Sequence, residues 1–121
     1  MFNPKRLLKS FRHALCGLRN ALAWEQSLRI QLIISLIVIF LMFYFPTRRL
    51  EKVALILVIM GVLTLELINT IFERLSDILK PRAHHYIKDI KDIMAATVLV
   101  ASIGALIIGL LILGPYILQK F

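Results

Sequence analysis

The residues best suited to chemistry form one stripe in the middle of the chain. Glu66, Asn69, Glu73 and Asp77 follow one another at spacings of three, four and four residues. Because an α-helix turns once every 3.6 residues, this spacing places all of them on one helical face. Carboxylates can act as general bases, and they supply the oxygen ligands that Mg²⁺ prefers. The stripe therefore predicts a catalytic or cation-binding face.

The stripe begins deep inside an apolar segment. Glu66 lies 14 residues after Lys52, or about 21 Å along a helix, which is inside a hydrocarbon core about 30 Å thick. Glu73 lies about 10 Å further on, near the membrane surface. An ionisable residue at this depth costs about 2–3 kcal/mol even on mild scales, so we expect Glu66 to be functional. The structural alternative is that Asn69 and Thr70 bond neighbouring helices while Glu66 pairs with an arginine.

The composition explains why such depth is expected. Hydrophobic residues make up 60% of the 121 residues, and the mean hydropathy is +0.84. This excludes a disordered chain, and the single cysteine excludes a disulfide scaffold. A soluble domain of this length could not hide so much apolar surface, which leaves a small integral membrane protein. Lys and Arg outnumber Asp and Glu by 15 to 7, and we expect their partner to be anionic lipid rather than nucleic acid.

Apolar periodicity predicts an all-α membrane protein with one N-terminal amphipathic surface helix and three transmembrane helices. We expect one domain over residues 1–121, with the surface helix at about 4–27 and spans at about 28–46, 52–79 and 90–118. Basic residues are richest before the first span and between the second and third spans. By the positive-inside rule, the N-terminus and the segment at 74–92 are therefore expected in the cytoplasm.

The segment at 4–27 alternates two kinds of residue at helical spacing. Leucine, alanine and phenylalanine form one face, and lysine and arginine, including Arg19, fill the other positions. This pattern is typical of a helix that lies on a membrane surface. Gly17 lowers helix stability, and it could allow close approach of a backbone or a ligand. The simpler alternative is that the helix only anchors and orients the protein.

Further charged residues are expected at the same cytoplasmic level as the stripe. Glu25 precedes the first span, and the pair Lys91 and Asp92 opens the third span. Lys88 and His84 lie one and two turns before that pair. Such a run of charges is often only a solvated helix face, but its position level with the acidic stripe favours a site.

Several common catalytic motifs are missing from the sequence. It contains no Walker A loop, no G-x-G-x-x-G, and no motif set of soluble protein kinases. There is no cysteine and histidine grouping with zinc spacing, and no plausible nucleophile triad. The chemistry must therefore come from the acidic stripe and its neighbours.

The whole pattern resembles the prokaryotic diacylglycerol kinase family, which includes the undecaprenol kinases. The resemblance is carried by E-x-x-N-T-x-x-E-x-x-x-D beginning at Glu66, by Gly17-Leu18-Arg19, by Glu25 followed by Arg29, and by the run from Lys88 to Asp92. It covers nearly the whole chain in order. The sequence departs from the family pattern at Gln31, Ile71, Phe72 and Ser76. These departures leave every polar residue of the motifs in place.

This resemblance implies an ATP- and Mg²⁺-dependent kinase that phosphorylates a membrane lipid alcohol. It implies a homotrimer with shared active sites, in the bacterial cytoplasmic (inner) membrane. Glu66 would be the general base, and Glu25 and Glu73 would hold the metal. The remaining residues would support or contact the nucleotide: Asn69, Asp77, His84, Lys88, Lys91, Asp92, Gly17 and Arg19, with Arg29 as a weaker candidate.

Three alternatives stay open at this point. The expected substrate is diacylglycerol, which would become phosphatidic acid, and undecaprenol is the other candidate. A small proton-coupled transporter built around Glu66 belongs to a different class, but it would not need Glu25, Glu73 or the Lys91 and Asp92 pair. A purely structural membrane subunit would tolerate Glu66→Leu.

Overall fold

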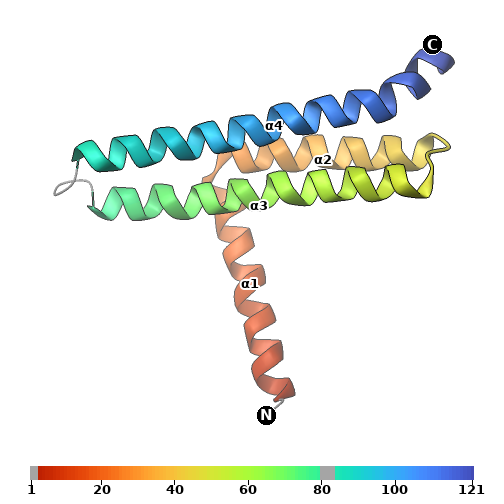
Figure 1. Ribbon diagram of the computed structural model, residues 1–121. Helices are drawn as coiled ribbons and strands as arrows, with labels where there is room; N and C mark the ends of the chain where they lie inside the picture. The colour runs from red at the N-terminus through yellow and green to blue at the C-terminus, as the bar shows by residue number, and fades with distance from the viewer. Residues whose placement is uncertain (1–2, 80–83) are drawn as a thin grey trace.

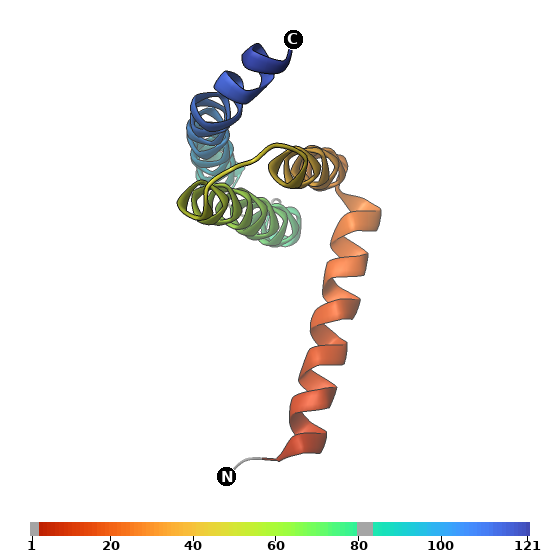
Figure 2. The same cartoon turned by 90° about the vertical axis from the view of Figure 1, so that its right-hand side faces the viewer.

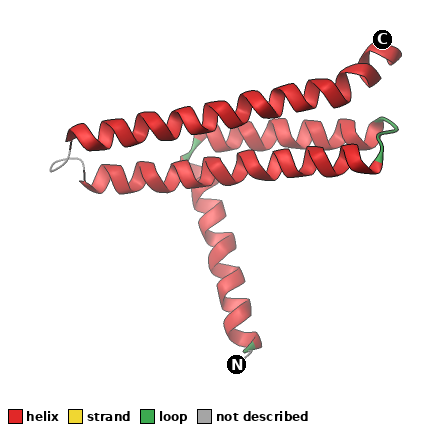
Figure 3. Cartoon of the chain, in the orientation of Figure 1, coloured by secondary structure: helices red, strands yellow, loops and turns green. Residues whose placement is uncertain are grey.

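The computed structural model describes residues 3–79 and 84–121, and every element in these residues is an α-helix (Figure 3). In chain order the helices are α1 (Pro4–Trp24), α2 (Gln26–Tyr44), α3 (Arg49–Leu79) and α4 (His84–Lys120). α2, α3 and nearly all of α4 are long and apolar enough to cross a membrane. The predicted all-α class, with one N-terminal helix before three helices of spanning length and composition, is confirmed.

The three long helices lie side by side, and α1 leaves them at a steep angle (Figure 1). Viewed along the bundle, the three long helices lie at the corners of a triangle (Figure 2). α3 packs extensively against both α4 and α2, whereas α2 and α4 contact each other much less. α3 is therefore the central helix. The acidic stripe thus lies on the helix that both other long helices contact.

α1 begins with a well-formed N-terminal cap. The side chain of Asn3 accepts hydrogen bonds from the backbone N–H groups of Lys5 and Arg6, and Pro4 occupies the first helical position. Leu8 and Phe11, on the apolar face of α1, are each more than half exposed. The amphipathic helix expected from the sequence is thus present, with its apolar face open.

A break at Glu25 separates α1 from α2, so the first helix ends three residues before the predicted limit of 27. Glu25 has extended backbone angles, with φ −108° and ψ 114°. Arg29 secures the break from the first turn of α2, because its guanidinium donates to the carbonyl oxygens of Leu22 at 3.2 Å and Ala23 at 3.0 Å. The break contains no glycine or proline, which is why apolar periodicity alone did not locate it.

Contacts at both ends determine how α3 and α4 run against each other. At one end Leu55 of α3 and Leu113 of α4 belong to one buried cluster with Met42 and Phe45. At the other end Lys91 of α4 lies 3.4 Å from Asp77 of α3. The two contacts are equally far apart along both helices, so α3 and α4 are antiparallel. Glu66 and Ser102, midway between these contacts, lie level with each other.

Two helices start earlier than the sequence indicated. α3 begins at Arg49 rather than at about 52, and the carboxylate of Glu51 accepts a hydrogen bond of 2.8 Å from the backbone N–H of Arg48 just before it. α4 begins at His84 rather than at about 90. The prediction followed apolar residues, whereas a helix also incorporates polar residues beside its apolar part.

Candidate active site

The structure brings three glutamates together where α1, α2 and α3 meet. Glu66 and Glu73 lie two turns apart on α3, and the break at Glu25 turns that residue towards them. The carboxyl groups of Glu25 and Glu73 lie within hydrogen-bonding reach of each other, and the charge of Glu66 also acts on Glu25. Residues far apart in sequence therefore form one acidic cluster, which we call the glutamate cluster (Glu25, Glu66 and Glu73).

Glu66 is the most buried member of the glutamate cluster. Its side chain is only 4% exposed, and its carboxyl group makes no hydrogen bond or ion pair within residues 3–79 and 84–121. The hydroxyl of Thr70 donates to the backbone carbonyl of Glu66 at 3.0 Å, within the same helix. The structural alternative, in which Glu66 pairs with an arginine and Thr70 bonds a neighbouring helix, is therefore not what the described residues form.

The surroundings of Glu25 disfavour its charge. Burial is the largest cause that raises its pKa, followed by the negative charge of Glu73 and the hydrogen bond with that side chain. The charge of Glu66 acts in the same direction, and the nearby guanidinium of Arg74 acts in the opposite one. The cluster thus carries more negative charge than its protein neighbours compensate, which is a setting that a cation would stabilise.

The donor set fits Mg²⁺ that is shared with a phosphate-bearing ligand. No group of three or more His, Cys, Asp or Glu side chains in the described part of the chain could enclose a metal ion. However, Mg²⁺ is usually bound by one or two carboxylates together with waters and substrate phosphates. The Glu25 and Glu73 pair offers such hard oxygen ligands, so it fits a metal that arrives with a nucleotide.

A second charged group lies at the end of α3, one turn beyond Glu73. Lys91 makes its 3.4 Å ion pair with Asp77, and the two side chains are 37% and 71% exposed. This contact joins two residues that the family resemblance assigns to the nucleotide. Lys88 and Asp92 are exposed on the same part of α4, and among the described residues neither makes an ion pair with the glutamate cluster.

The remaining predicted site residues lie in different parts of the structure. Asn69 is half-buried on α3, between Glu66 and Glu73. His84 opens α4, but its side chain lies outside the described residues. Arg19 is exposed on α1. Gly17 lines a cavity of ≈ 440 Å³ between α1 and α3, together with Thr70 and Arg74.

The close backbone approach considered for Gly17 is not present among the described residues. A Cβ atom added at this position would meet no atom within 4 Å. An added Cβ would therefore lie in open space beside the α1–α3 cavity.

Arg74 is a neighbour of the site, and the sequence placed it only among the basic residues at 74–92 that indicate orientation in the membrane. Its guanidinium lies 5.2 Å from the ring centre of Trp24, the last residue of α1, in a cation–π contact. The same charge acts on Glu25. Arg74 therefore helps to hold the break between α1 and α2 against α3. Its place next to Glu73 in the sequence was the only signal available.

Comparison with known proteins identifies the family of this chain. The family model described as prokaryotic diacylglycerol kinase matches residues 12–113, which include every site residue named above. The chain is 32% identical over 110 residues to the undecaprenol kinase of Bacillus subtilis (strain 168), covering 91% of this chain and 89% of that protein. It is 34% identical over 114 residues to the diacylglycerol kinase of Synechocystis sp., covering 93% of this chain and 65% of that protein.

Proposed function

Because the chain belongs to the prokaryotic diacylglycerol kinase family of lipid kinases, we propose that it transfers the γ-phosphoryl group of ATP to a membrane lipid alcohol. Diacylglycerol is the substrate that we favour, with phosphatidic acid as the product, and undecaprenol is the alternative. One observation carries the proposal. A nearly fully buried glutamate, Glu66, lies in one cluster with the carboxylate pair of Glu25 and Glu73.

Glu66 acts as the general base in this proposal. It accepts the proton of the lipid hydroxyl as the oxygen attacks the γ-phosphorus, and the bond from that phosphorus to the β–γ bridging oxygen breaks to release ADP. Its position suits the task, because the acceptor is dissolved in the membrane and ATP stays in water. The two substrates can meet only near the cytoplasmic surface. Phosphoryl transfer depends mainly on positioning and on charge stabilisation, so this chain does not need a Walker loop.

The other site residues bind and orient the nucleotide. Glu25 and Glu73 would hold Mg²⁺, which would neutralise charge on the phosphates. Lys91 neutralises further phosphate charge, and Asp77 positions it through their ion pair. The residues that support this end of the site are Asn69, Lys88, Asp92, His84, Arg19 and Gly17. The opening beside Gly17 in the α1–α3 cavity supports a ligand contact there.

The site requires a defined orientation in the membrane. We place the N-terminus and the α3–α4 connection on the cytoplasmic side of the bacterial inner membrane, with α1 on the membrane surface. The excess of basic residues in these segments supports that orientation. A homotrimer with active sites shared between subunits completes the proposal, since one chain offers few walls for a site.

Purified protein in detergent micelles, given labelled ATP and Mg²⁺, tests the function directly. Diacylglycerol, undecaprenol and a total lipid extract are supplied in separate reactions. We expect label in phosphatidic acid. Label mainly in undecaprenyl phosphate would select the alternative substrate, and label in no lipid would overturn the proposal. The kinase relatives support an enzyme rather than the proton-coupled transporter considered above.

A further inference from the structure

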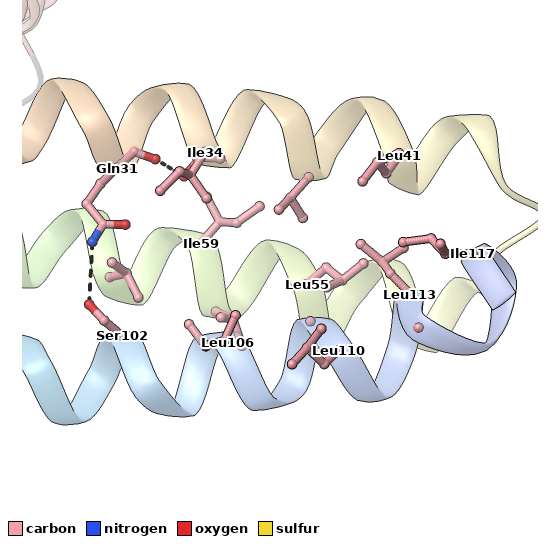
Figure 4. A pocket seen from close by; sticks show the side chains of 17 residues that line it. Gln31, Ile34, Leu41, Leu55, Ile59, Ser102, Leu106, Leu110, Leu113 and Ile117 are labelled. Carbon is pink, nitrogen blue, oxygen red and sulfur yellow. Dashed lines mark hydrogen bonds between the residues drawn. The ribbon is translucent and has the colours of Figure 1, made fainter. Parts of the chain in front are cut away.

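A second cavity, separate from the one beside Gly17, runs between α2 and α4. It has a volume of ≈ 380 Å³, and α3 forms its floor (Figure 4). Apolar side chains line almost all of it, including Ile34, Val62 and Leu106. We call it the α2–α4 groove. From Ser102 to Ile117 its α4 wall is about 22 Å long, which exceeds the half-thickness of a hydrocarbon core, about 15 Å.

The end of the groove nearest the cytoplasm is polar. The side-chain amide of Gln31 on α2 donates to the hydroxyl oxygen of Ser102 on α4 at 3.4 Å (Figure 4). Ser35, which also lines the groove, is already satisfied because its hydroxyl donates to the backbone carbonyl of Gln31 at 2.7 Å. Gln31 and Ser102 therefore form the polar end of the groove.

This polar pair has donors left over. An amide NH₂ group carries two N–H donors and a hydroxyl carries one O–H donor. Within the described residues, only one N–H of Gln31 is used, and the hydroxyl of Ser102 only accepts. Unused donors at membrane depth are costly because no bulk water satisfies them. The arrangement therefore calls for a ligand that offers an acceptor oxygen.

The groove leads to the proposed base. Val62 and Ile59 form part of its floor, and Glu66 follows them by four and seven residues on the same face of α3. Ser102 lies level with Glu66 across the bundle. A lipid whose chain occupies the groove would thus present its polar end beside Glu66.

We propose, on the basis of the proposed kinase function, that the α2–α4 groove seats an acyl chain of an ester-bearing lipid alcohol whose ester carbonyl accepts hydrogen bonds from Gln31 and Ser102. The groove alone cannot select a lipid, because bilayer chains are as apolar as its leucines. The polar end can. A diacylglycerol carries carbonyl oxygens a few bonds from its free hydroxyl, whereas a polyprenol carries only the hydroxyl that reacts. The pair therefore determines specificity for glycerolipid esters.

Ester and ether lipids of equal chain length test this role of the polar pair. Diacylglycerol and the matching dialkylglycerol, which lacks both carbonyls, are compared as substrates in mixed micelles. We expect kcat/KM to favour the ester about tenfold, the factor that corresponds to one neutral hydrogen bond of about 1.4 kcal/mol. Gln31→Leu and Ser102→Ala should reduce this ratio towards one.

The control is Thr97→Val, which removes an α4 hydroxyl that donates to the carbonyl of Ile93 in its own helix. It should keep the wild-type ratio. Equal use of ester and ether by the wild type, or an unchanged ratio in Gln31→Leu, would overturn the inference while leaving the kinase intact. Phosphorylation of neither glycerolipid would also overturn the inference, and only phosphorylation of no lipid at all, undecaprenol included, would overturn the proposed function.

A blocked groove gives a second test that does not depend on the polar pair. Gly109 lines the groove and Gly104 does not, and at both positions an added Cβ would meet nothing within 4 Å. Gly109→Leu should lower kcat/KM for long-chain diacylglycerol about tenfold and spare a short-chain one. Gly104→Leu, the matched control, should affect both alike.

The same variants distinguish a lipid from a second copy of the chain in the groove. If a helix of another subunit occupies it, Gly109→Leu will change the oligomer mass in detergent and reduce activity equally for both chain lengths. That result would overturn the inference. An unchanged mass with a chain-length-dependent loss would support it.

Discussion

Glu66 illustrates how a single side chain can be costly for the fold and useful for chemistry. It is 4% exposed, lies well inside the apolar length of α3, and is not neutralised by an ion pair with any described residue. A charged group at such depth costs about 2–3 kcal/mol even on mild scales. A leucine would be cheaper at this position, so the glutamate has to be explained by what it does.

Replacement of Glu66 by glutamine should separate fold from function. We expect Glu66→Gln to purify as a folded protein and to lose about 10²- to 10⁴-fold in turnover, the usual contribution of a general base. The matched control is Glu51→Gln at the other end of α3, where Glu51 bonds the Tyr116 hydroxyl at 2.6 Å. Helicity and lipid phosphorylation are measured for both. Near-normal turnover in Glu66→Gln would contradict the assignment.

The raised pKa of Glu25 predicts how the stability of the protein depends on pH. Its pKa is raised in the folded protein, first by burial and then by Glu73. Its contribution to stability is therefore present below the ordinary glutamate pKa and is lost as pH rises through the folded-state pKa. Without Mg²⁺, we expect Glu25→Gln to melt above the wild type at neutral pH, and the difference to vanish in mild acid. Thermal melts across this range check it, and a difference that grows in acid would contradict it.

At the level of elements, the site depends on how helices end and on how they lie against one another. The break at Glu25 matters because a continuous α1–α2 helix would carry that carboxylate away from α3. Arg29 and Arg74 hold the break, one by bonding the last carbonyls of α1 and the other by packing over Trp24. At the far end of α3, Asp77 and Lys91 connect the stripe to α4.

The Asp77–Lys91 pair should matter more for nucleotide binding than for folding. Both side chains are substantially exposed, and such pairs contribute at most about 1 kcal/mol to stability. We therefore expect Asp77→Asn to change the melting temperature little. Lys91→Met should raise the KM for ATP with little effect on the KM for lipid. Lys52→Met, at the opposite end of the bundle, is the control, and an equal effect of both lysine variants would argue against a phosphate contact.

At the scale of the whole molecule, much of the surface is open to lipid or to other subunits. α4 exposes large apolar side chains along its length, including Leu99, Leu106 and Leu111. Within the part of the chain that the structure describes, only α3 covers it substantially. One chain covers few of its own helix faces. This is consistent with the proposed trimer, in which neighbouring subunits would complete each site.

Mixing of inactive subunits tests the shared site. Glu66→Gln and Lys91→Met subunits are expected to be nearly inactive separately at low ATP. If Lys91 serves the Glu66 of a neighbouring subunit, oligomers assembled from both variants will contain some sites with both native residues and will regain activity. Activity is measured after co-expression with two different affinity tags. No recovery in oligomers that carry both tags would show that each site lies within one chain.

Much of the site could be predicted from local spacing. The three, four and four spacing of Glu66, Asn69, Glu73 and Asp77 is sufficient to place them on one face, because helical geometry is the same wherever the helix lies. Apolar length was likewise sufficient to predict three helices able to span a membrane. The start of α4 was harder to predict from the sequence, because its first turns are polar and resemble a loop in composition.

Tertiary structure decided which distant residues meet. The approach of Glu25 to Glu73 required a helix break that is stabilised by Arg29, seven residues beyond Leu22 whose carbonyl it bonds. The contact of Gln31 with Ser102 spans 71 positions and depends on the antiparallel alignment of α2, α3 and α4. The sequence by itself therefore determined the elements and the face of each, since both follow from local periodicity. Packing decided the alignment and the chain direction at Glu25, because these depend on contacts between helices.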